Sequence, residues 1–333
     1  MKNTFIVITS ISDQNNPVIN IFANESTVRE IPFILIGDTK SPLVFDLIGC
    51  DYYSVERQKS LLFKLSKILP YKHYSRKNIG YLIAIQKGAE VIIETDDDNY
   101  PTNEFWEPRK NKVNAYLIND KGWVNIYKYF SKNHIWPRGF ALDHILDPLP
   151  KLENKSIIYC PIQQGLADDN PDVDAIYRLT LPLPITFIKS DSIAISNNSI
   201  CPFNSQNTTW FKEAFPLLYL PSFCNFRMTD IWRSFVAQRI ARTCNWSILF
   251  HNSTVTQIRN DHNLMTDFND ELSGYINNTS IVNQLNLLKL KKGINNIPYN
   301  MKICYHKLSD MNLVGKEEYN LLNAWLDDIN NII

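Results

Sequence analysis

The sequence lacks a charge imbalance, a paired-cysteine motif and a long apolar run. Lys plus Arg and Asp plus Glu both total 34, so no bulk charge draws the chain to nucleic acid or to a membrane. The six cysteines form no Cys-x-x-Cys pair, which indicates buried thiols in a reducing compartment rather than a zinc site or disulfide framework. No apolar run approaches the roughly 20 residues of a membrane span, and the apolar start, residues 5–8, is too short for a signal peptide. The composition predicts a soluble, cytoplasmic globular protein, with peripheral membrane attachment left open.

The sequence does contain three consecutive acids at the end of a predicted strand. Residues 91–93 are aliphatic and lead into Glu94-Thr95-Asp96-Asp97-Asp98. In open α/β sheets, ligands bind outside the carboxyl ends of the strands. Adjacent carboxylates repel one another unless a cation holds them, and Mg²⁺ or Mn²⁺ commonly bridges such oxygens to substrate phosphates. The alternative is a solvated acidic loop.

Strands and helices alternate around this motif. Strands are predicted over 5–10 and 32–38, and helical spacing covers 54–69 and 78–88. The second helix leads directly into the acid-bearing strand, which predicts a parallel sheet with right-handed crossovers.

The rest of the chain is less regular. Residues 100–200 are rich in Pro, Asn and Asp and are expected to form loops with short strands. Thr229 is a predicted N-cap of a following helix, and 247–250 is a short strand. Two amphipathic segments, 281–291 and 317–333, predict a helical cap or tail.

Several charged residues outside the triple acid are candidates for binding. Arg76 and Lys77 open a helix, where cations and free N–H groups can hold a diphosphate. Arg138 lies between Pro137 and Gly139 and requires an anionic partner. In an acidic turn, Asp172 and Asp174 are candidates for binding sugar hydroxyls. At a helix start, Asp230 is a candidate for an ionised general base. In a late polar stretch, His251 or His262 is a candidate for an additional metal ligand, and Arg259 for binding the nucleotide sugar. For each, a purely structural role is the alternative.

The order of these motifs resembles that of a known family. It is similar to the UDP-arabinopyranose mutases, the reversibly glycosylated polypeptides, and more closely to the STELLO-type glycosyltransferase-like domain. The segments that carry the first resemblance are Asp96–Asp98, Pro137–Phe140, Pro171–Ala175, Thr229–Trp232 and His251–Ser253. Those that carry the second are Gly80–Ala89, Asn170–Leu179 and Pro202–Thr208. The resemblance covers about 1–275 and leaves the tail unexplained.

The resemblance implies an α/β GT-A-like fold, with a Rossmann-type nucleotide-binding sheet, an acceptor-side extension and a C-terminal helical tail. It divides the chain into a transferase domain, 1–275, and a helical cap, 276–333. Asp96 and Asp98 would hold Mn²⁺ or Mg²⁺, with Asp97 orienting the metal or the ribose. Thr9, Ser10, Gly37 and Asp38 would line the nucleotide, and Arg76 and Lys77 would face the diphosphate. Arg138 matches the arginine that the mutases are thought to glycosylate.

The implied function is metal-dependent transfer from a nucleotide sugar, a UDP-sugar by preference, to a glycan or lipid-linked glycan. Two alternatives remain open: a nucleotide-sugar mutase, and a non-catalytic GT-A-like scaffold of a glycan-synthesis complex. No nucleic acid partner and no integral membrane segment are expected.

Overall fold

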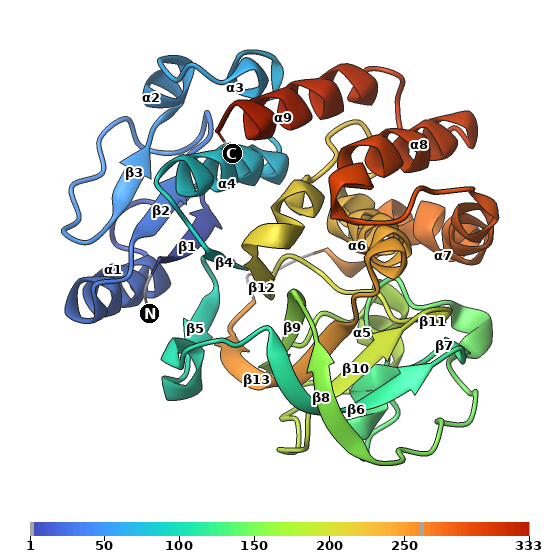
Figure 1. The fold of residues 1–333 in the computed structure, drawn as a ribbon. Coiled ribbons are helices and arrows are strands. Elements are labelled where there is room, and N and C mark those ends of the chain that lie inside the picture. Colours follow the sequence, from blue (N-terminus) through green and yellow to red (C-terminus); the bar gives the residue numbers. More distant parts are fainter. Residues whose placement is uncertain (1–2, 260–262, 333) are drawn as a thin grey trace.

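A central mixed β-sheet with helices on both faces organises the computed structural model, which describes residues 3–259 and 263–332 (Figure 1). Its first four strands are parallel and run in the order β3-β2-β1-β4. Their bounds are β1 Thr4–Thr9, β2 Phe33–Ile36, β3 Asp51–Tyr53 and β4 Val91–Thr95. Because the strands are parallel, the residues that follow β1, β2 and β4 meet at one edge of the sheet.

The sheet continues with both parallel and antiparallel pairs. The order after β4 is β12-β9-β13-β10-β6-β8, and β5 pairs with the end of β13. The bounds are β5 Asn99–Pro101, β6 Lys112–Asn119, β8 Lys155–Tyr159, β9 Ile162–Asp168, β10 Ile193–Ser196, β12 Asn207–Phe211 and β13 Ile248–Gln257. A small separate sheet joins β7 Gly122–Trp123 and β11 Ser199–Ile200. The segment expected to be mainly loops, 100–200, thus supplies four of the eleven strands described in the main sheet and most of a fifth, β5.

The helix α4, Lys77–Gln86, packs closely on the parallel strands. A Cβ atom at Gly80 would lie only 2.5 Å from Val7 Cγ1 and 2.9 Å from Ile36 Cγ1, so the approach of helix to sheet requires glycine. Gly88, with φ of +86°, ends the turn after the helix. On the opposite face, α1 (Pro17–Arg29) covers β1 and is capped by the side chain of Asn16.

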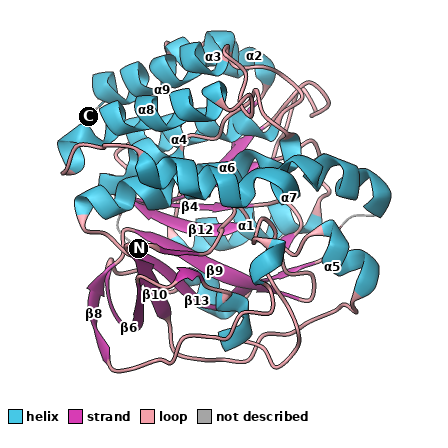
Figure 2. Ribbon diagram, turned by 90° about the vertical axis from the view of Figure 1, so that its right-hand side faces the viewer, coloured by secondary structure: helices cyan, strands magenta, loops and turns pink. Residues whose placement is uncertain are grey.

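Helices from the C-terminal part of the chain cover the same face as α4 (Figure 2). These are α6 Thr229–Ala241, α7 Leu264–Leu287, α8 Ile297–Asp310 and α9 Glu318–Ile332. Trp325 of α9 packs on Tyr81 of α4, with ring centroids 6.5 Å apart. None of the helices in the described ranges is long and apolar enough to cross a bilayer.

A fully buried ion pair joins α6 to the sheet. Glu94 of β4 accepts hydrogen bonds from both Nη atoms of Arg233, at 2.7 and 3.0 Å, and their side chains are 0% and 1% exposed. Trp210 of β12 donates its indole N–H to the same carboxylate at 2.8 Å, and Tyr81 of α4 donates its hydroxyl. Four elements therefore meet at Glu94, two residues before the triple acid.

The predicted α/β class, with a Rossmann-type half, an extension and C-terminal helices, is confirmed. The details differ in two places. The helix expected over 54–69 is two short helices, α2 Val55–Lys59 and α3 Lys64–Ile68. The second of these begins where Asp328 of α9 accepts the N–H groups of Lys64 and Leu65, a contact that local spacing cannot reveal.

The C-terminal helices also depart from expectation. The predicted boundary between 275 and 276 falls inside α7, which is continuous from Leu264 to Leu287. Helix α8 lies between the two predicted amphipathic segments and was not expected. The C-terminal helices pack on α3, α4 and α6.

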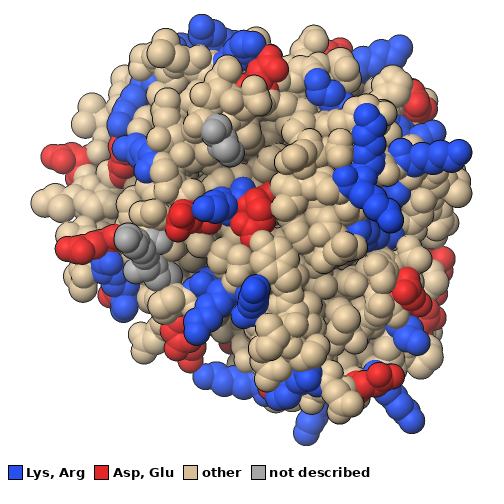
Figure 3. All heavy atoms as spheres, viewed as in Figure 1, with Lys and Arg blue, Asp and Glu red and all other residues tan. Residues whose placement is uncertain are grey.

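Charge is mixed over the surface. Acidic and basic side chains are interspersed over much of the face shown in Figure 3, in line with the equal totals of 34. Lys and Arg side chains gather in one strip at the upper right of that view.

Candidate functional site

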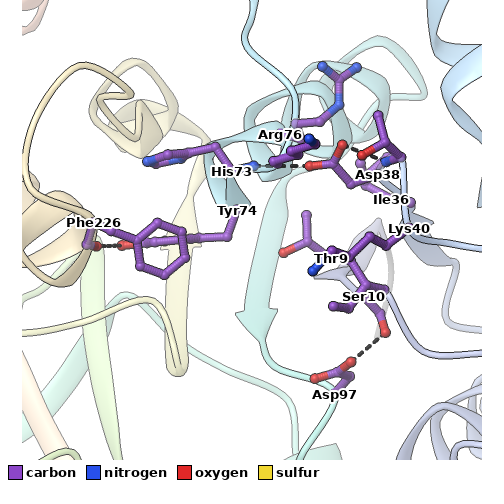
Figure 4. A pocket seen from close by; sticks show the side chains of 14 residues that line it. Thr9, Ser10, Ile36, Asp38, Lys40, His73, Tyr74, Arg76, Asp97 and Phe226 are labelled. Atoms are coloured by element: carbon purple, nitrogen blue, oxygen red, sulfur yellow. Dashed lines mark hydrogen bonds between the residues drawn. The ribbon is translucent and has the colours of Figure 1, made fainter. Parts of the chain in front are cut away.

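A cavity of about 290 Å³ opens where β1 and β2 end. We call it cavity A. Thr9 and Ser10 line it from the end of β1, and Gly37 and Asp38 from the end of β2 (Figure 4). The Asp38 carboxylate accepts the backbone N–H of His73 at 3.0 Å. The four residues expected to surround a nucleotide are thus brought together.

Three aromatic rings form one wall of cavity A. His73 stacks on Tyr74 with ring centroids 5.4 Å apart, and Tyr74 meets Phe226 edge-on at 4.9 Å. Burial lowers the pKa of His73 to about 4 against an opposing effect of Asp38, so its imidazole is neutral at pH 7. Phe226 is 49% exposed and offers an apolar surface to a flat ring.

A second cavity, cavity B, adjoins the first and has a volume of about 310 Å³. It shares Thr9, Tyr74, Asp97 and Phe226 with cavity A. Its remaining lining residues are Asp96, Asp98, Arg138, Ser205, Arg227 and Asp230. The triple acid, two residues of the aromatic wall and Arg138 thus line one cavity.

The three acids are held in different ways. Asp96 accepts a 2.7 Å hydrogen bond from Lys77 Nζ, which also donates to the backbone oxygens of Thr95 and Ser205. Asp97 accepts the hydroxyls of Ser10 and Ser12. Two of the three negative charges are thus stabilised by the protein itself.

Asp98 differs from its neighbours. Its Oδ2 accepts from Gln257 Nε2 at 2.9 Å, whereas its Oδ1 is buried and has no hydrogen-bond partner in the part of the chain that the structure describes. Burial, and then the charge of Asp96, raise the pKa of Asp98 to about 7. A buried, unsatisfied carboxylate oxygen fits a cation ligand.

The donor set around the triple acid is small. Within the described residues, no group of three or more His, Cys, Asp or Glu side chains is arranged to enclose a metal ion. Mg²⁺ commonly uses one or two carboxylates together with substrate phosphates and water. Asp96 and Asp98, which both line cavity B, could supply the two carboxylates.

Arg138 is the centre of a buried ion network. Its guanidinium contacts both oxygens of Asp172, at 2.8 and 2.9 Å, and Asp230 Oδ2 at 3.0 Å. Burial alone would lower the pKa of Arg138, but the charges of Asp172 and Asp230 outweigh it and raise that pKa well above its ordinary value. Arg138 is therefore a permanent cation.

The predicted general base, Asp230, is part of this network and has no free oxygen. Besides Arg138, its carboxylate accepts the backbone N–H of Ser205 at 3.1 Å and the hydroxyl of Tyr74 at 3.3 Å. It lines cavity B, but it positions Arg138 and is not a free proton acceptor. The general-base assignment is corrected accordingly.

A third cavity, cavity C, of about 180 Å³, lies beyond the acids. It shares Asp96, Asp98, Arg138, Arg227 and Asp230 with cavity B. Its other lining residues are Asp172, Arg178, Gln206, Gln257 and Arg259. Asp172 and Arg259 thus lie at the site, as the sequence predicted.

Two predicted diphosphate ligands are almost fully buried, and of these Arg76 lines cavity A (Figure 4). Arg76 is 1% exposed, and its guanidinium donates to Gln58 Oε1 and to the backbone oxygen of Leu69. Lys77 is 0% exposed and fixes Asp96. Lys77 lines none of the three cavities, so its assignment as a diphosphate ligand is corrected. The assignment of Arg76, which lines cavity A, stays a prediction.

Asp174 and His251 also have other roles. Asp174 is 0% exposed, caps α5 (Ala175–Thr180) through the N–H of Tyr177 and accepts the Trp136 indole N–H at 2.6 Å. It therefore cannot contact a sugar.

His251 pairs with Gly165 in the middle of β13, whereas Gln257, at the end of that strand, contacts Asp98. Six strand residues span on the order of 15–20 Å. His251 is therefore too far away to be a ligand of a metal ion held by Asp98. His262 lies outside the described residues.

The sequence interpretation missed the aromatic wall and two arginines. His73 and Tyr74 directly precede the Arg76-Lys77 pair that it singled out, and Arg178 falls within the Asn170–Leu179 segment that carried the resemblance. Their positions next to the Arg76-Lys77 pair and within the Asn170–Leu179 segment were the sequence signal that could have identified these residues. Phe226 and Arg227 had no such signal beyond their position before the predicted helix at 229.

A comparison of the sequence with models of known protein families identifies a relationship for the C-terminal third of the chain. A model of the STELLO glycosyltransferases matches residues 227–333. The resemblance to the STELLO-type family is confirmed. The matched segment includes the C-terminal helices, which the sequence interpretation had left unexplained, and it contributes Arg227, Asp230, Gln257 and Arg259 to the cavities.

Two relatives from Arabidopsis thaliana are similar over most of the chain. The probable glycosyltransferase STELLO2 is 29% identical over 266 residues, covering 73% of this chain and 34% of the relative. The probable glycosyltransferase STELLO1 is 27% identical over 235 residues, covering 64% and 30%. The chain thus spans about a third of the length of these relatives. A solved mycobacterial protein shares 8% identity and a TM-score of 0.43 over 84% of this chain and 75% of its own, a likeness too weak to carry an inference.

Proposed function

We propose that the chain is a metal-dependent glycosyltransferase that transfers a sugar from a nucleotide sugar, by preference a UDP-sugar, to a glycan or lipid-linked glycan. The observation that carries the proposal is the continuous series of cavities A, B and C at the carboxyl ends of β1, β2 and β4. The names of the STELLO relatives, probable glycosyltransferases, support it.

Each part of a nucleotide sugar has a matching surface. The base would stack on Phe226 and Tyr74, because an exposed aromatic ring binds any nucleobase face. The carboxylate of Asp38 lies in the same cavity and can accept hydrogen bonds from ribose hydroxyls. The diphosphate would then lie beside the triple acid in cavity B.

The acids would hold a divalent cation at this point. Asp96 and Asp98 are the proposed ligands, and Lys77 keeps Asp96 in place through its 2.7 Å hydrogen bond. The bound cation would neutralise the charge that develops on the leaving diphosphate. Asp97 would orient the ribose or the metal from its position between Ser10 and Ser12.

The mutase alternative is less well supported. It requires Arg138 to accept a sugar as a nucleophile, and a guanidinium must lose a proton to do so. Asp172 and Asp230 hold Arg138 in its charged form and occupy its Nε and one Nη. Arg138 therefore remains a charged guanidinium whose Nε and one Nη are already bonded to carboxylates, which does not suit a nucleophile.

A thermal-shift experiment tests the proposal. UDP with Mn²⁺ at a hundredfold excess over Kd should stabilise the protein by about 2.7 kcal/mol, and a chelator should remove most of the shift. Asp98→Ala should lose the Mn²⁺-dependent part, whereas Asp143→Ala, at a side chain 67% exposed, should keep it. An equal shift in Asp98→Ala would show that the metal assignment is wrong.

Labelled donors then separate transfer from isomerisation. Incubation of the protein with a radiolabelled UDP-sugar should give product only when a glycan acceptor is added. Label retained on the protein without acceptor, and lost in Arg138→Ala, would establish the mutase instead. Failure to bind any nucleotide sugar would favour the scaffold.

A further inference from the structure

Cavity C contains one arginine, Arg178, that forms no ion pair with a carboxylate in the part of the chain that the structure describes. Three arginines line it besides Arg138, namely Arg178, Arg227 and Arg259. Arg227 pairs with Glu271 at 2.7 Å, and Arg259 pairs with Asp267 at 2.6 Å. Two of the three charges are thus matched by carboxylates behind the cavity wall.

Arg178 is bound differently. It donates to the backbone oxygen of Pro171 at 2.9 Å and to Asn170 Oδ1 at 3.4 Å, both neutral acceptors. Its Nε is buried without a hydrogen-bond partner, and no carboxylate in the described ranges lies within ion-pair distance of it. Burial and the charges of Arg259 and Arg227 lower the pKa of Arg178 to about 10, against the opposing effect of Asp172 and Glu271, so the guanidinium still carries its charge at pH 7.

The carboxylates of cavity C do not supply the missing partner. Asp96 is bound by Lys77, and Asp172 and Asp230 are bound by Arg138. Asp98 is the acid that contacts only a neutral side chain, Gln257. The cavity therefore presents one unmatched acid and one unmatched arginine, and the two are not bonded to each other.

The position of cavity C identifies which part of a substrate would reach it. Among the lining residues that the structure describes, cavities A and C have none in common, and cavity B separates them. With the nucleoside in A and the diphosphate in B, cavity C receives the sugar or the acceptor. Arg178 is half-buried, and its buried Nε has no hydrogen-bond partner in the described chain, which costs free energy. A bidentate oxyanion is the ligand that the geometry of a guanidinium favours.

We propose that cavity C binds an oxyanion, a carboxylate or a phosphate, that is carried by the transferred sugar or by its acceptor, with Arg178 as the main ligand. This inference rests on the proposed function for its placement of the substrate. It restricts the substrates to acidic sugars or phosphorylated acceptors, since a neutral glycan would leave Arg178 uncompensated.

Binding of small sugar ligands tests this inference. Isothermal titration with methyl glucuronide, glucose 1-phosphate and neutral methyl glucoside would be done in the presence of UDP and Mn²⁺. At least one charged ligand should bind about ten- to a hundredfold more tightly than the neutral one, the range expected for a charged hydrogen bond. Preference for the glucuronide would identify an acidic sugar, and preference for the phosphate a phosphorylated acceptor.

Variants complete the test. Arg178→Gln should abolish the preference for charge, and Arg178→Lys should retain part of it. Arg29→Gln removes an exposed arginine that lines none of the three cavities and serves as the matched control, which should keep the preference. Equal binding of charged and neutral ligands, or an undiminished preference in Arg178→Gln, would overturn the inference.

The two proposals can fail separately. Arg178→Gln should bind UDP and Mn²⁺ as the parent does, because Arg178 lines neither cavity A nor cavity B. If the parent itself does not bind UDP and Mn²⁺, the proposed function fails, and the titrations without nucleotide still decide whether Arg178 holds an oxyanion.

Discussion

Replacing Asp98 by Asn should stabilise the metal-free protein at neutral pH while removing its metal-dependent binding. The folded protein raises the pKa of Asp98 to about 7, compared with about 3.9 in an unfolded chain. Between these values the folded state binds more protons than the unfolded state, so stability falls as pH rises. The loss of stability from burying the ionised Asp98 carboxylate is absent below about pH 4 and complete above about pH 7. An Asn side chain does not ionise, so the variant does not lose stability in this way.

The size of the effect follows from the shift. Three pKa units correspond to about 4 kcal/mol as an upper limit, and partial access of solvent to the carboxylate reduces this to about 1–3 kcal/mol. Unfolding 333 residues carries an entropy of about 0.7 kcal/mol/K. Asp98→Asn should therefore raise the melting temperature at pH 8 by about 1.5–4 °C.

Thermal melts in chelator at pH 5 and pH 8 provide the assay. The gain of Asp98→Asn over the parent should grow between the two pH values. Asp97→Asn is the control from the same loop, because Ser10 and Ser12 already satisfy that carboxylate, and it should show no gain. A pH-independent difference, or a loss of stability at pH 8, would refute the argument that Asp98 is an uncompensated acid.

Three further outcomes are expected. Glu94→Ala should destabilise the protein by about 3–5 kcal/mol, since it leaves Arg233 buried without its anion, and adding Arg233→Met should recover part of the loss in urea melts. Phe226→Ala should weaken UDP binding by about 1–3 kcal/mol through lost stacking but leave pyrophosphate binding unchanged, as calorimetry with both ligands would show. His251→Ala should bind UDP and Mn²⁺ with parental affinity, and a clear loss in the same titration would return His251 to the site.

Local sequence pattern was sufficient for the parallel half of the fold. The strand before Asp96 and the helix α4 before it are continuous in sequence, and glycine marks their junction. The strands β9, β12 and β13 pair across long stretches of chain, β12 antiparallel to β4 and β9, and β13 parallel to β9. No local period records such pairing. Helix α8 was not predicted because Gly293 interrupts the helical pattern and Pro298 lies in the first turn of the helix.

For the site, the sequence located the residues but not their partners. Asp38, Asp96 and Asp98 follow strands and lie where the topology requires. The roles of Arg76 and Lys77 depend on Gln58 and Ser205, which reach them from distant segments. Whether a charge faces a ligand or is bonded within the protein is decided by such contacts, and these are properties of the folded chain.

Helix α9 imposes an order on the biogenesis of this fold. Asp328 caps α3 from a position 264 residues later in the chain, and Trp325 covers Tyr81 of α4. As the chain leaves the ribosome, α3 and α4 precede these partners by most of the sequence. The surfaces of α3 and α4 that α9 covers therefore stay exposed until α9 is made. Helix α9 must pack on them before they associate with other chains.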